Sequence, residues 1–191
     1  MMKYTIAYIA LAASLTLTGC GSFLATMQSN TLEDDPGERT MGQQLEDESI
    51  ETKAIVNLHA ANEAFDQAHL VVVSYNGYIL LAGQVHSEAL KAQATEVVRK
   101  IRRVRRIYNE LEVASPSSAM TRTSDTWITT KVKSYLLGRS GIEGGRVKVI
   151  TENGVVFLMG LATQAEADRV ADTASGISGV QRVVRIFEII D

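Results

Sequence analysis

Residues 71–83 read VVVSYNGYILLAG, and residues 147–160 read VKVITENGVVFLMG. In both stretches an apolar run leads to an Asn-Gly pair, and a second apolar run follows and ends in glycine. Asn-Gly between two such runs is the strongest short signal for a β-hairpin, because both residues tolerate a positive φ. The chain therefore holds two predicted hairpins, with turns at Asn76-Gly77 and Asn153-Gly154 that we expect to be exposed. The strands, rather than the helices, are expected to carry the core, through Val72, Leu80, Val149 and Leu158.

The repeat extends in both directions from the hairpins. Before them, residues 48–58 (ESIETKAIVNL) align with residues 126–136 (TWITTKVKSYL), and apolar residues three and four apart predict a helix in each. After them, each copy has a second helix and a closing strand. We expect these helices over 86–102 and 163–177, and these strands over 107–113 and 183–190. A match of this length with few gaps indicates a duplicated module.

Each copy has the order αββαβ. Two helices would cover one face of a three-stranded sheet, and the last connection is long enough for a parallel crossover, so the sheet is mixed. We predict an α+β chain made of two such modules. The expected divisions are a signal peptide at 1–19, a lipidated cysteine and flexible tether at 20–45, a first copy at 46–114, a linker at 115–123 and a second copy at 124–191.

The N-terminal segment differs from the rest of the chain. Lys3 precedes an apolar stretch that is too short to span a bilayer, as in a signal peptide. The stretch ends in Leu17-Thr18-Gly19-Cys20, which matches the bacterial lipobox, and Cys20 is the only cysteine. We predict that Cys20 carries the lipid, because several acyl chains together anchor a protein stably. The alternative is an ordinary signal peptide with an unmodified cysteine. Gly21 stands where an aspartate would retain a lipoprotein in the inner membrane, which favours the outer membrane.

Composition and motifs argue against catalysis. The formal net charge of the 191 residues is −3, which gives no bulk basic character for nucleic-acid binding. The histidines, His59, His69 and His86, have no partner at metal-ligand or catalytic spacing, and we expect them on the surface. The glycines serve turns and form no phosphate-binding loop. We therefore expect no enzyme activity, no catalytic or metal-binding residue and no cofactor. A periplasmic hydrolase would need a polar constellation that we do not find in the sequence.

A basic run in the first copy is the strongest local charge feature. Residues 99–106 read RKIRRVRR, and their cations are Arg99, Lys100, Arg102, Arg103, Arg105 and Arg106. This run could be a solvated face that balances acids elsewhere. It could also contact phosphate groups or an acidic partner, since each cation near an anionic membrane contributes about 1 kcal/mol. The aligned GISGVQRV of the second copy keeps only Arg182, so any role of the run belongs to the first copy.

The only tryptophan, Trp127, lies in the first helix of the second copy. At about 100° per residue, the expected core stripe of this helix is Ile128, Val132, Tyr135 and Leu136. Trp127 and Leu137 fall outside that stripe, and the first copy has Ser49 and His59 in their places, so the fold does not require apolar residues there.

Exposed apolar residues beside cations are typical of an interfacial membrane helix. The predicted phospholipid-binding residues are Trp127, Thr130, Lys131, Lys133, Ser134 and Leu137. The alternative is that Trp127 packs against the first copy or the linker.

The αββαβ pattern with V.V...NG...L.G and a closing V..V resembles the BON domain, and the whole chain resembles the dual-BON outer-membrane lipoproteins. The segments SDTWITTKV (124–132) and ITENGVVFLMGL (150–161) are especially similar. The tether also fits, through Pro36, Arg39, Gly42 and Gln44.

The resemblance implies a lipid-anchored protein of the outer membrane that faces the periplasm. It implies binding to an anionic phospholipid membrane through the second BON domain, enrichment at the division site and support of envelope integrity. The other open function is that of an adaptor, which would regulate an envelope machine (barrel assembly or peptidoglycan amidase activation) through protein contacts.

Overall fold

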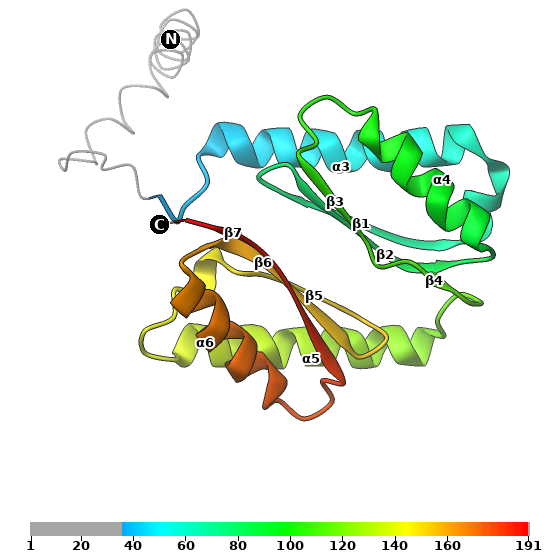
Figure 1. The fold of residues 1–191 in the computed structure, drawn as a ribbon. Helices are drawn as coiled ribbons and strands as arrows, with labels where there is room; N and C mark the ends of the chain where they lie inside the picture. Colours follow the sequence, from blue (N-terminus) through cyan, green and yellow to red (C-terminus); the bar gives the residue numbers. More distant parts are fainter. Residues whose placement is uncertain (1–35, 191) are drawn as a thin grey trace, which may run out of the picture. The chain divides into compact units, whose positions relative to one another are not determined.

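The computed structural model describes residues 36–190 of the 191-residue chain (Figure 1). The predicted signal peptide, Cys20 and most of the predicted tether lie outside these residues, so what was expected of them stays a prediction. Within residues 36–190, no helix is long and apolar enough to cross a membrane.

The first copy follows the predicted order αββαβ, with one short 3₁₀ helix added. Its elements are α3 (Met41–Ala61), η1 (Glu63–Gln67), β1 (His69–Tyr75), β2 (Tyr78–Val85), α4 (Glu88–Arg99), β3 (Arg106–Asn109) and β4 (Glu112–Val113). The hairpin turn between β1 and β2 has φ angles of 50° at Asn76 and 75° at Gly77. Positive φ at both positions is what the Asn-Gly pair predicts.

The second copy repeats this order. Its elements are α5 (Ala119–Gly138), η2 (Gly144–Arg146), β5 (Lys148–Glu152), β6 (Val155–Ala162), α6 (Gln164–Ser175) and β7 (Arg182–Ile189). The turn between β5 and β6 has the same φ angles as the first, 50° at Asn153 and 75° at Gly154. The two hairpins are therefore equivalent in their backbones as well as in their sequences.

Both sheets are mixed, and the α+β fold class is confirmed. The hairpin strands pair in antiparallel fashion, while β3 and β7 pair in parallel with β2 and β6. The closing strand of the first copy is interrupted at Asn109. Its side-chain amide donates to the carbonyl oxygen of Lys91 and to Oγ1 of Thr95, each at 2.7 Å, and its side-chain oxygen accepts from the N–H of Leu111 at 3.2 Å. Pairing with β2 then resumes at β4.

Two helices begin before the module boundaries that we expected. Helix α3 begins at Met41, inside the predicted tether, and α5 begins at Ala119, inside the predicted linker. Thr40 caps α3 in a capping box with Gln43, and Ser118 caps α5 by accepting from the N–H of Thr121. Threonine and serine at these places are helix-start signals that the sequence already carried.

Each copy has a hydrophobic core between its helices and one face of its sheet. In the first copy, Ile50 and Leu58 of α3 and Val98 of α4 pack with Val72 and Leu81 of the strands. The second copy is built in the same way from α5, α6 and its sheet. The expectation that the strands alone carry the core is therefore wrong, because the helices supply a large part of it. The four strand residues expected to be buried are buried: Val72, Leu80, Val149 and Leu158.

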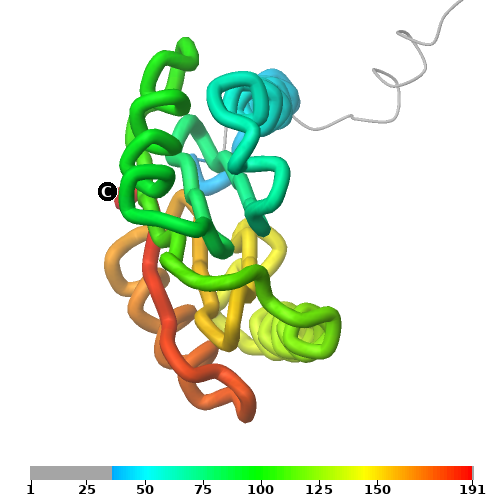
Figure 2. Tube along the Cα trace, turned by 90° about the vertical axis from the view of Figure 1, so that its right-hand side faces the viewer, coloured from blue at the N-terminus to red at the C-terminus, as the bar shows by residue number. Residues whose placement is uncertain are grey.

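The other faces of the two sheets pack against each other. The cluster between them joins Val73, Tyr75, Leu80 and Ala82 of the first copy to Val155, Phe157, Met159 and Ile186 of the second. Leu80 is thus buried against the second copy, whereas Leu81 faces the core of its own copy. The arrangement has four layers, with the helices outside and the two sheets inside (Figures 1 and 2).

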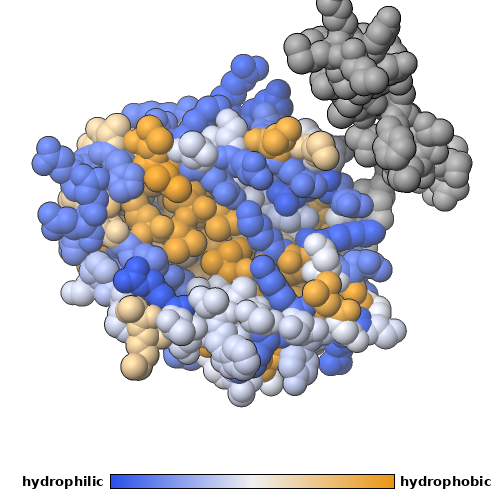
Figure 3. All heavy atoms as spheres, turned by 180° about the vertical axis from the view of Figure 1, so that it is seen from behind, coloured by the Kyte–Doolittle hydropathy of each residue, from blue (hydrophilic) through white to orange (hydrophobic). Residues whose placement is uncertain are grey.

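Half-buried apolar residues border the cluster between the sheets. Seen from behind, hydrophobic atoms gather in one area (Figure 3). Half-buried Val71 of β1 and Ile150 of β5, the edge strands of the two sheets, pack against the cluster.

Candidate functional site

A buried aspartate ties the first helix of the first copy to its hairpin turn. Asp47 is 2 % exposed, and its carboxylate accepts from the N–H groups of Asn76 at 2.7 Å and Gly77 at 3.0 Å. It also accepts from the hydroxyl of Ser74 and from the guanidinium of Arg39, each at 2.6 Å. Burial alone would raise the pKa of Asp47, but these hydrogen bonds lower it below its ordinary value.

The second copy has the same arrangement. Asp125 is 5 % exposed and accepts from the N–H groups of Asn153 and Gly154, each at 2.9 Å. The expectation that both turns are exposed is therefore wrong for the glycines, since Gly77 and Gly154 are buried, whereas Asn153 is exposed. Sequence reasoning missed Asp47 and Asp125, although each stands three residues before an aligned isoleucine.

A groove opens beside Trp127 in the second copy. It has a volume of about 620 Å³ and lies between α5, the Asn153-Gly154 turn and the loop around Ser178. Lys131 enters this groove and donates from Nζ to the carbonyl oxygen of Ser178 at 2.5 Å and to its hydroxyl at 3.1 Å. The groove therefore combines an aromatic wall with polar groups and one cation.

The structure brings most of the predicted phospholipid-binding residues onto one face of α5. Trp127 is 63 % exposed and Leu137 is 68 % exposed, and the exposed Thr130 and Ser134 lie between them along the helix. At 3.6 residues per turn, these four positions form one stripe, and Lys131 flanks it. Met120, which is 83 % exposed and lines the same groove, continues the stripe two turns earlier. Sequence reasoning missed Met120, although it stands seven residues before Trp127.

One expectation about α5 was wrong, and one predicted residue lies apart. Tyr135 was expected in the core but is 61 % exposed, because Ile128, Val132 and Leu136 form the buried line of the helix. Trp127 does not belong to the cluster between the copies, which speaks against packing on the first copy, but it lines one groove with Ser118, Met120 and Thr121 of the predicted linker. Lys133 is exposed but lines a different pocket, together with Arg39, Tyr75 and Lys148.

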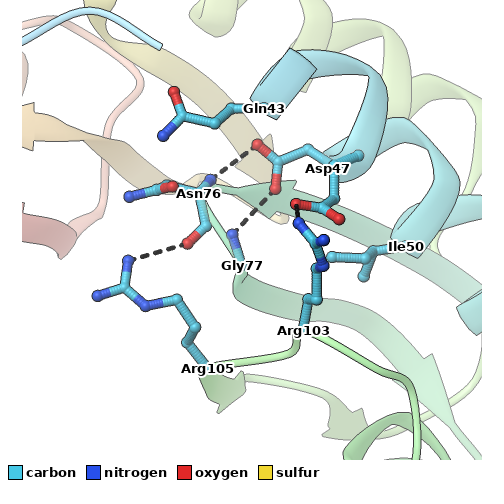
Figure 4. A pocket seen from close by; sticks show the side chains of 8 residues that line it. Gln43, Asp47, Ile50, Asn76, Gly77, Arg103 and Arg105 are labelled. Atoms are coloured by element: carbon cyan, nitrogen blue, oxygen red, sulfur yellow. Dashed lines mark hydrogen bonds and ion pairs between the residues drawn. The ribbon is translucent and has the colours of Figure 1, made fainter. Parts of the chain in front are cut away.

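The equivalent groove of the first copy is smaller and is lined by two arginines. It has a volume of about 300 Å³ and is lined by Gln43, Asp47, Gly77, Arg103 and Arg105 among others (Figure 4). Arg103 donates to Glu46 at 2.6 Å, and Arg105 donates to the carbonyl oxygen of Asn76 at 3.2 Å.

The aligned positions in the second copy hold residues without charge. Gly179 stands in the place of Arg103, and Gln181 in the place of Arg105. Both Arg103 and Gly179 have a positive φ, 73° and 100°, so the backbone is alike and the side chains differ.

The rest of the basic run is divided between internal contacts and solvent. Arg99 pairs with Glu96 at 2.7 Å, and Arg105 forms two hydrogen bonds with Glu188 of β7, at 2.6 and 2.7 Å. Burial alone would raise the pKa of Glu188, but hydrogen bonds from Arg105 and Asn76 lower it. Lys100, Arg102 and Arg106 are exposed. Half of the cations in the run are therefore paired with acidic side chains, as expected of a solvated face that balances acids elsewhere.

The histidines form no common site. His59 pairs with Asp66 at 2.5 Å, and His86 is exposed. His69 was expected on the surface but is half-buried, and its Nε2 lies 3.2 Å from a carboxylate oxygen of the buried Glu152 in the other copy. Within residues 36–190, no group of three or more acidic, histidine or cysteine side chains could hold a metal ion.

Comparison with known proteins gives a family match for both copies. Residues 46–115 and 124–190 each match the family model described as "BON domain".

Three relatives match most of the chain. The chain is 36 % identical over 183 residues to "Outer membrane lipoprotein DolP" of Haemophilus influenzae, covering 96 % of this chain and 95 % of the relative. It is 36 % identical over 152 residues to "21 kDa hemolysin" of Actinobacillus pleuropneumoniae, covering 80 % and 78 %. It is 27 % identical over 193 residues to "Osmotically-inducible protein Y" of Escherichia coli, covering 96 % of both.

Proposed function

The chain belongs to the BON-domain family, as a protein with two BON domains of the DolP type, and on that basis we propose that it is an outer-membrane lipoprotein that binds anionic phospholipid through α5. It is anchored through Cys20, faces the periplasm and supports envelope integrity at the division site. It acts as a binding protein and carries out no catalysis. The name of the Haemophilus relative supports the location and the anchor.

The exposed face of α5 is the observation that carries the proposal. Trp127 and Leu137 are large apolar side chains exposed to water, on the opposite side of the helix from its buried line of Ile128, Val132 and Leu136. Burying a large apolar side chain stabilises a complex by about 1.5–3 kcal/mol, so insertion of these two residues would drive binding. Lys131 beside them would add attraction to anionic headgroups.

The two copies supply a matched test of this face. Thr130 of α5 and Thr52 of α3 are aligned and exposed, and each hydroxyl donates to the carbonyl oxygen four residues earlier, at 2.9 Å. Thr130→Glu places an anion on the proposed membrane face, and Thr52→Glu places the same anion on the first copy. We expect Thr130→Glu to weaken co-sedimentation with anionic vesicles by about tenfold or more, and Thr52→Glu to leave it nearly unchanged.

The experiment uses the soluble chain from Gly21 onward, which contains all three hydrophobic clusters. Zwitterionic vesicles serve as the reference, and circular dichroism checks the fold. Trp127→Glu should abolish most of the binding. If Trp127→Glu binds anionic vesicles as well as the parent, the face is misassigned. If the parent itself does not bind, the adaptor function takes the place of lipid binding.

The anchor is tested separately. Cys20→Ser should prevent acylation and leave the precursor uncleaved, which metabolic labelling with palmitate and a shift in gel mobility would report. Labelling of the variant would contradict the assignment of Cys20.

A further inference from the structure

The basic run of the first copy leaves three cations that no acidic side chain within residues 36–190 neutralises. Three of its cations have acidic partners: Arg99 with Glu96, Arg103 with Glu46 and Arg105 with Glu188. The other three, Lys100, Arg102 and Arg106, are exposed and have no ion pair within residues 36–190, although the guanidinium of Arg106 lies 5.6 Å from the ring centroid of Tyr108. We call Lys100, Arg102 and Arg106 the basic corner. It stands out on a chain whose formal net charge is −3.

The basic corner is held in place by the paired arginines next to it. The backbone N–H groups of Arg105 and Arg106 both donate to the carbonyl oxygen of Gly77, at 2.8 and 3.3 Å. The ion pair of Arg103 with Glu46 fixes the loop to α3, and the two hydrogen bonds of Arg105 with Glu188 fix it to the second copy. These contacts order the backbone that carries the basic corner, so less backbone entropy is lost when a partner binds.

The backbone supports a role for this loop. Arg103 has a φ of 73°, a conformation that favours glycine, and the second copy has Gly179 at the aligned position. Strained residues of this kind persist only where the surrounding structure holds them, and they cluster at functional sites. The first copy therefore keeps an arginine where the backbone favours a residue without a side chain.

The position of the basic corner argues against a lipid partner. The loop between α4 and β3, which carries Lys100 and Arg102, lies at the opposite end of the described unit from α5 in both ribbon views (Figures 1 and 2). With α5 on the membrane, as the proposed function has it, the corner faces away from the lipid. Residues 99–106 also have no exposed large apolar side chain that could insert into a bilayer.

We infer that the basic corner binds an acidic polypeptide segment of a partner protein. Guanidinium groups form paired hydrogen bonds with carboxylates, and two of the three cations are arginines. Opposite charge on a partner would speed the encounter and fix its orientation. The inference goes beyond phospholipid binding and uses the proposed function only to orient the molecule.

The test uses a fluorescein-labelled decaglutamate peptide and the chain from Gly21 onward, with fluorescence anisotropy at low salt. The variant Lys100→Gln/Arg102→Gln/Arg106→Gln removes the corner. The control variant Lys53→Gln/Arg122→Gln/Arg139→Gln removes three exposed cations elsewhere. We expect the first variant to bind about tenfold more weakly, the sum of three exposed ion pairs, and the control to match the parent.

Three results would overturn the inference. They are no binding of decaglutamate by the parent, an equal loss in the control, and retained peptide binding in the corner variant. If the corner variant instead loses binding to anionic vesicles, the corner is a lipid surface. Trp127→Glu separates the two sites, because it should lose vesicle binding and keep the peptide. If thermal melting shows that the triple variant is unfolded, Arg102→Gln alone gives the answer, with a loss of about twofold expected.

Discussion

The two grooves beside the hairpin turns show what the fold demands and what it leaves open. In both copies a buried aspartate, Asp47 or Asp125, accepts hydrogen bonds from an Asn-Gly turn with the same φ angles. Around this shared frame the surfaces differ. Ion-paired arginines line the smaller groove of the first copy, whereas an exposed tryptophan lines the larger groove of the second. Duplication thus kept the turn and gave the two surfaces separate chemistry.

The shared frame predicts the largest effect on stability. Asp47→Ala would leave three donors without this acceptor: the buried Ser74 hydroxyl and Gly77 N–H, and the part-buried Asn76 N–H. Asp125→Ala would leave two, the buried Gly154 N–H and the part-buried Asn153 N–H. At about 1–3 kcal/mol for each unsatisfied group, partly relieved by water, we expect losses of about 3 kcal/mol and about 2 kcal/mol in the free energy of unfolding. Urea denaturation measures both. The neighbouring Glu48→Ala and Thr126→Ala are the controls. An equal loss in a control would show that the destabilisation does not come from the hydrogen bonds that the aspartates accept.

Alanine substitution at the two turn glycines should lower stability by different amounts, although the φ angles of the two turns are the same. A Cβ at Gly77 would lie 2.6 Å from the carbonyl oxygen of Arg103, which is backbone and cannot move aside. A Cβ at Gly154 would lie 2.6 Å from Nε2 of Gln181, a side chain that can rotate away. Both alanine variants lose about 1 kcal/mol because φ is positive. We expect Gly77→Ala to lose at least about 1 kcal/mol more, and equal melting temperatures would contradict this.

Acid should weaken the first copy through Asp47. The pKa of Asp47 is lower in the folded chain than its ordinary value of 3.8, so its contribution to stability is complete above that value. The contribution is lost as the pH falls through the folded pKa, where the carboxylate becomes protonated. Asp47→Asn removes this titration. In thermal melts from pH 6 to pH 2, we expect the parent to lose more stability than Asp47→Asn does. Parallel curves would contradict the assignment.

The smallest expected effect on stability is at Arg103, which lines the first groove where the second copy has Gly179. Arg103→Gly relieves a positive φ that costs arginine about 1 kcal/mol, but it removes an exposed ion pair and adds chain entropy to the unfolded state. These contributions nearly cancel, so we expect the free energy of unfolding to change by less than about 0.5 kcal/mol. Arg102→Gly, at a residue without a positive φ, gains no relief and should lose about 0.5–1 kcal/mol. Differential scanning calorimetry of Arg103→Gly and Arg102→Gly measures both changes, and equal losses would contradict backbone strain at Arg103.

The order of the elements could be predicted because the two aligned copies carry the same sequence signals for helices, hairpin and closing strand. The buried aspartates could not be predicted from helical periodicity, since Asp47 and Asp125 interrupt an apolar pattern and look like surface positions. The packing of the two sheets did leave a signal. Residues 79–82 of β2 and 155–159 of β6 are continuously apolar rather than alternating, which is typical of strands buried on both faces.

The face of α5 was largely predictable, with one instructive error. Trp127 and Leu137 could be placed because the aligned Ser49 and His59 of the first copy mark positions that the core does not need. Tyr135 was misplaced because the buried line of α5 is narrow. Only Asp125, Ile128, Val132 and Leu136 are buried along this helix. Periodicity alone does not tell how wide a buried stripe is, because its width depends on what packs against it.

The packing of sheet on sheet also bears on the history of the chain. Each copy closes the second face of the other, so that Leu80, Phe157 and Met159 are 0–2 % exposed. An ancestor with a single copy would have presented such a face to water or to a second chain of its own kind. Once the two copies were joined and these faces became apolar, loss of either copy would leave the remaining one with an exposed hydrophobic sheet. In evolutionary terms, the packed sheets would oppose any reversal of the duplication, because a chain with one copy would have to cover this face again.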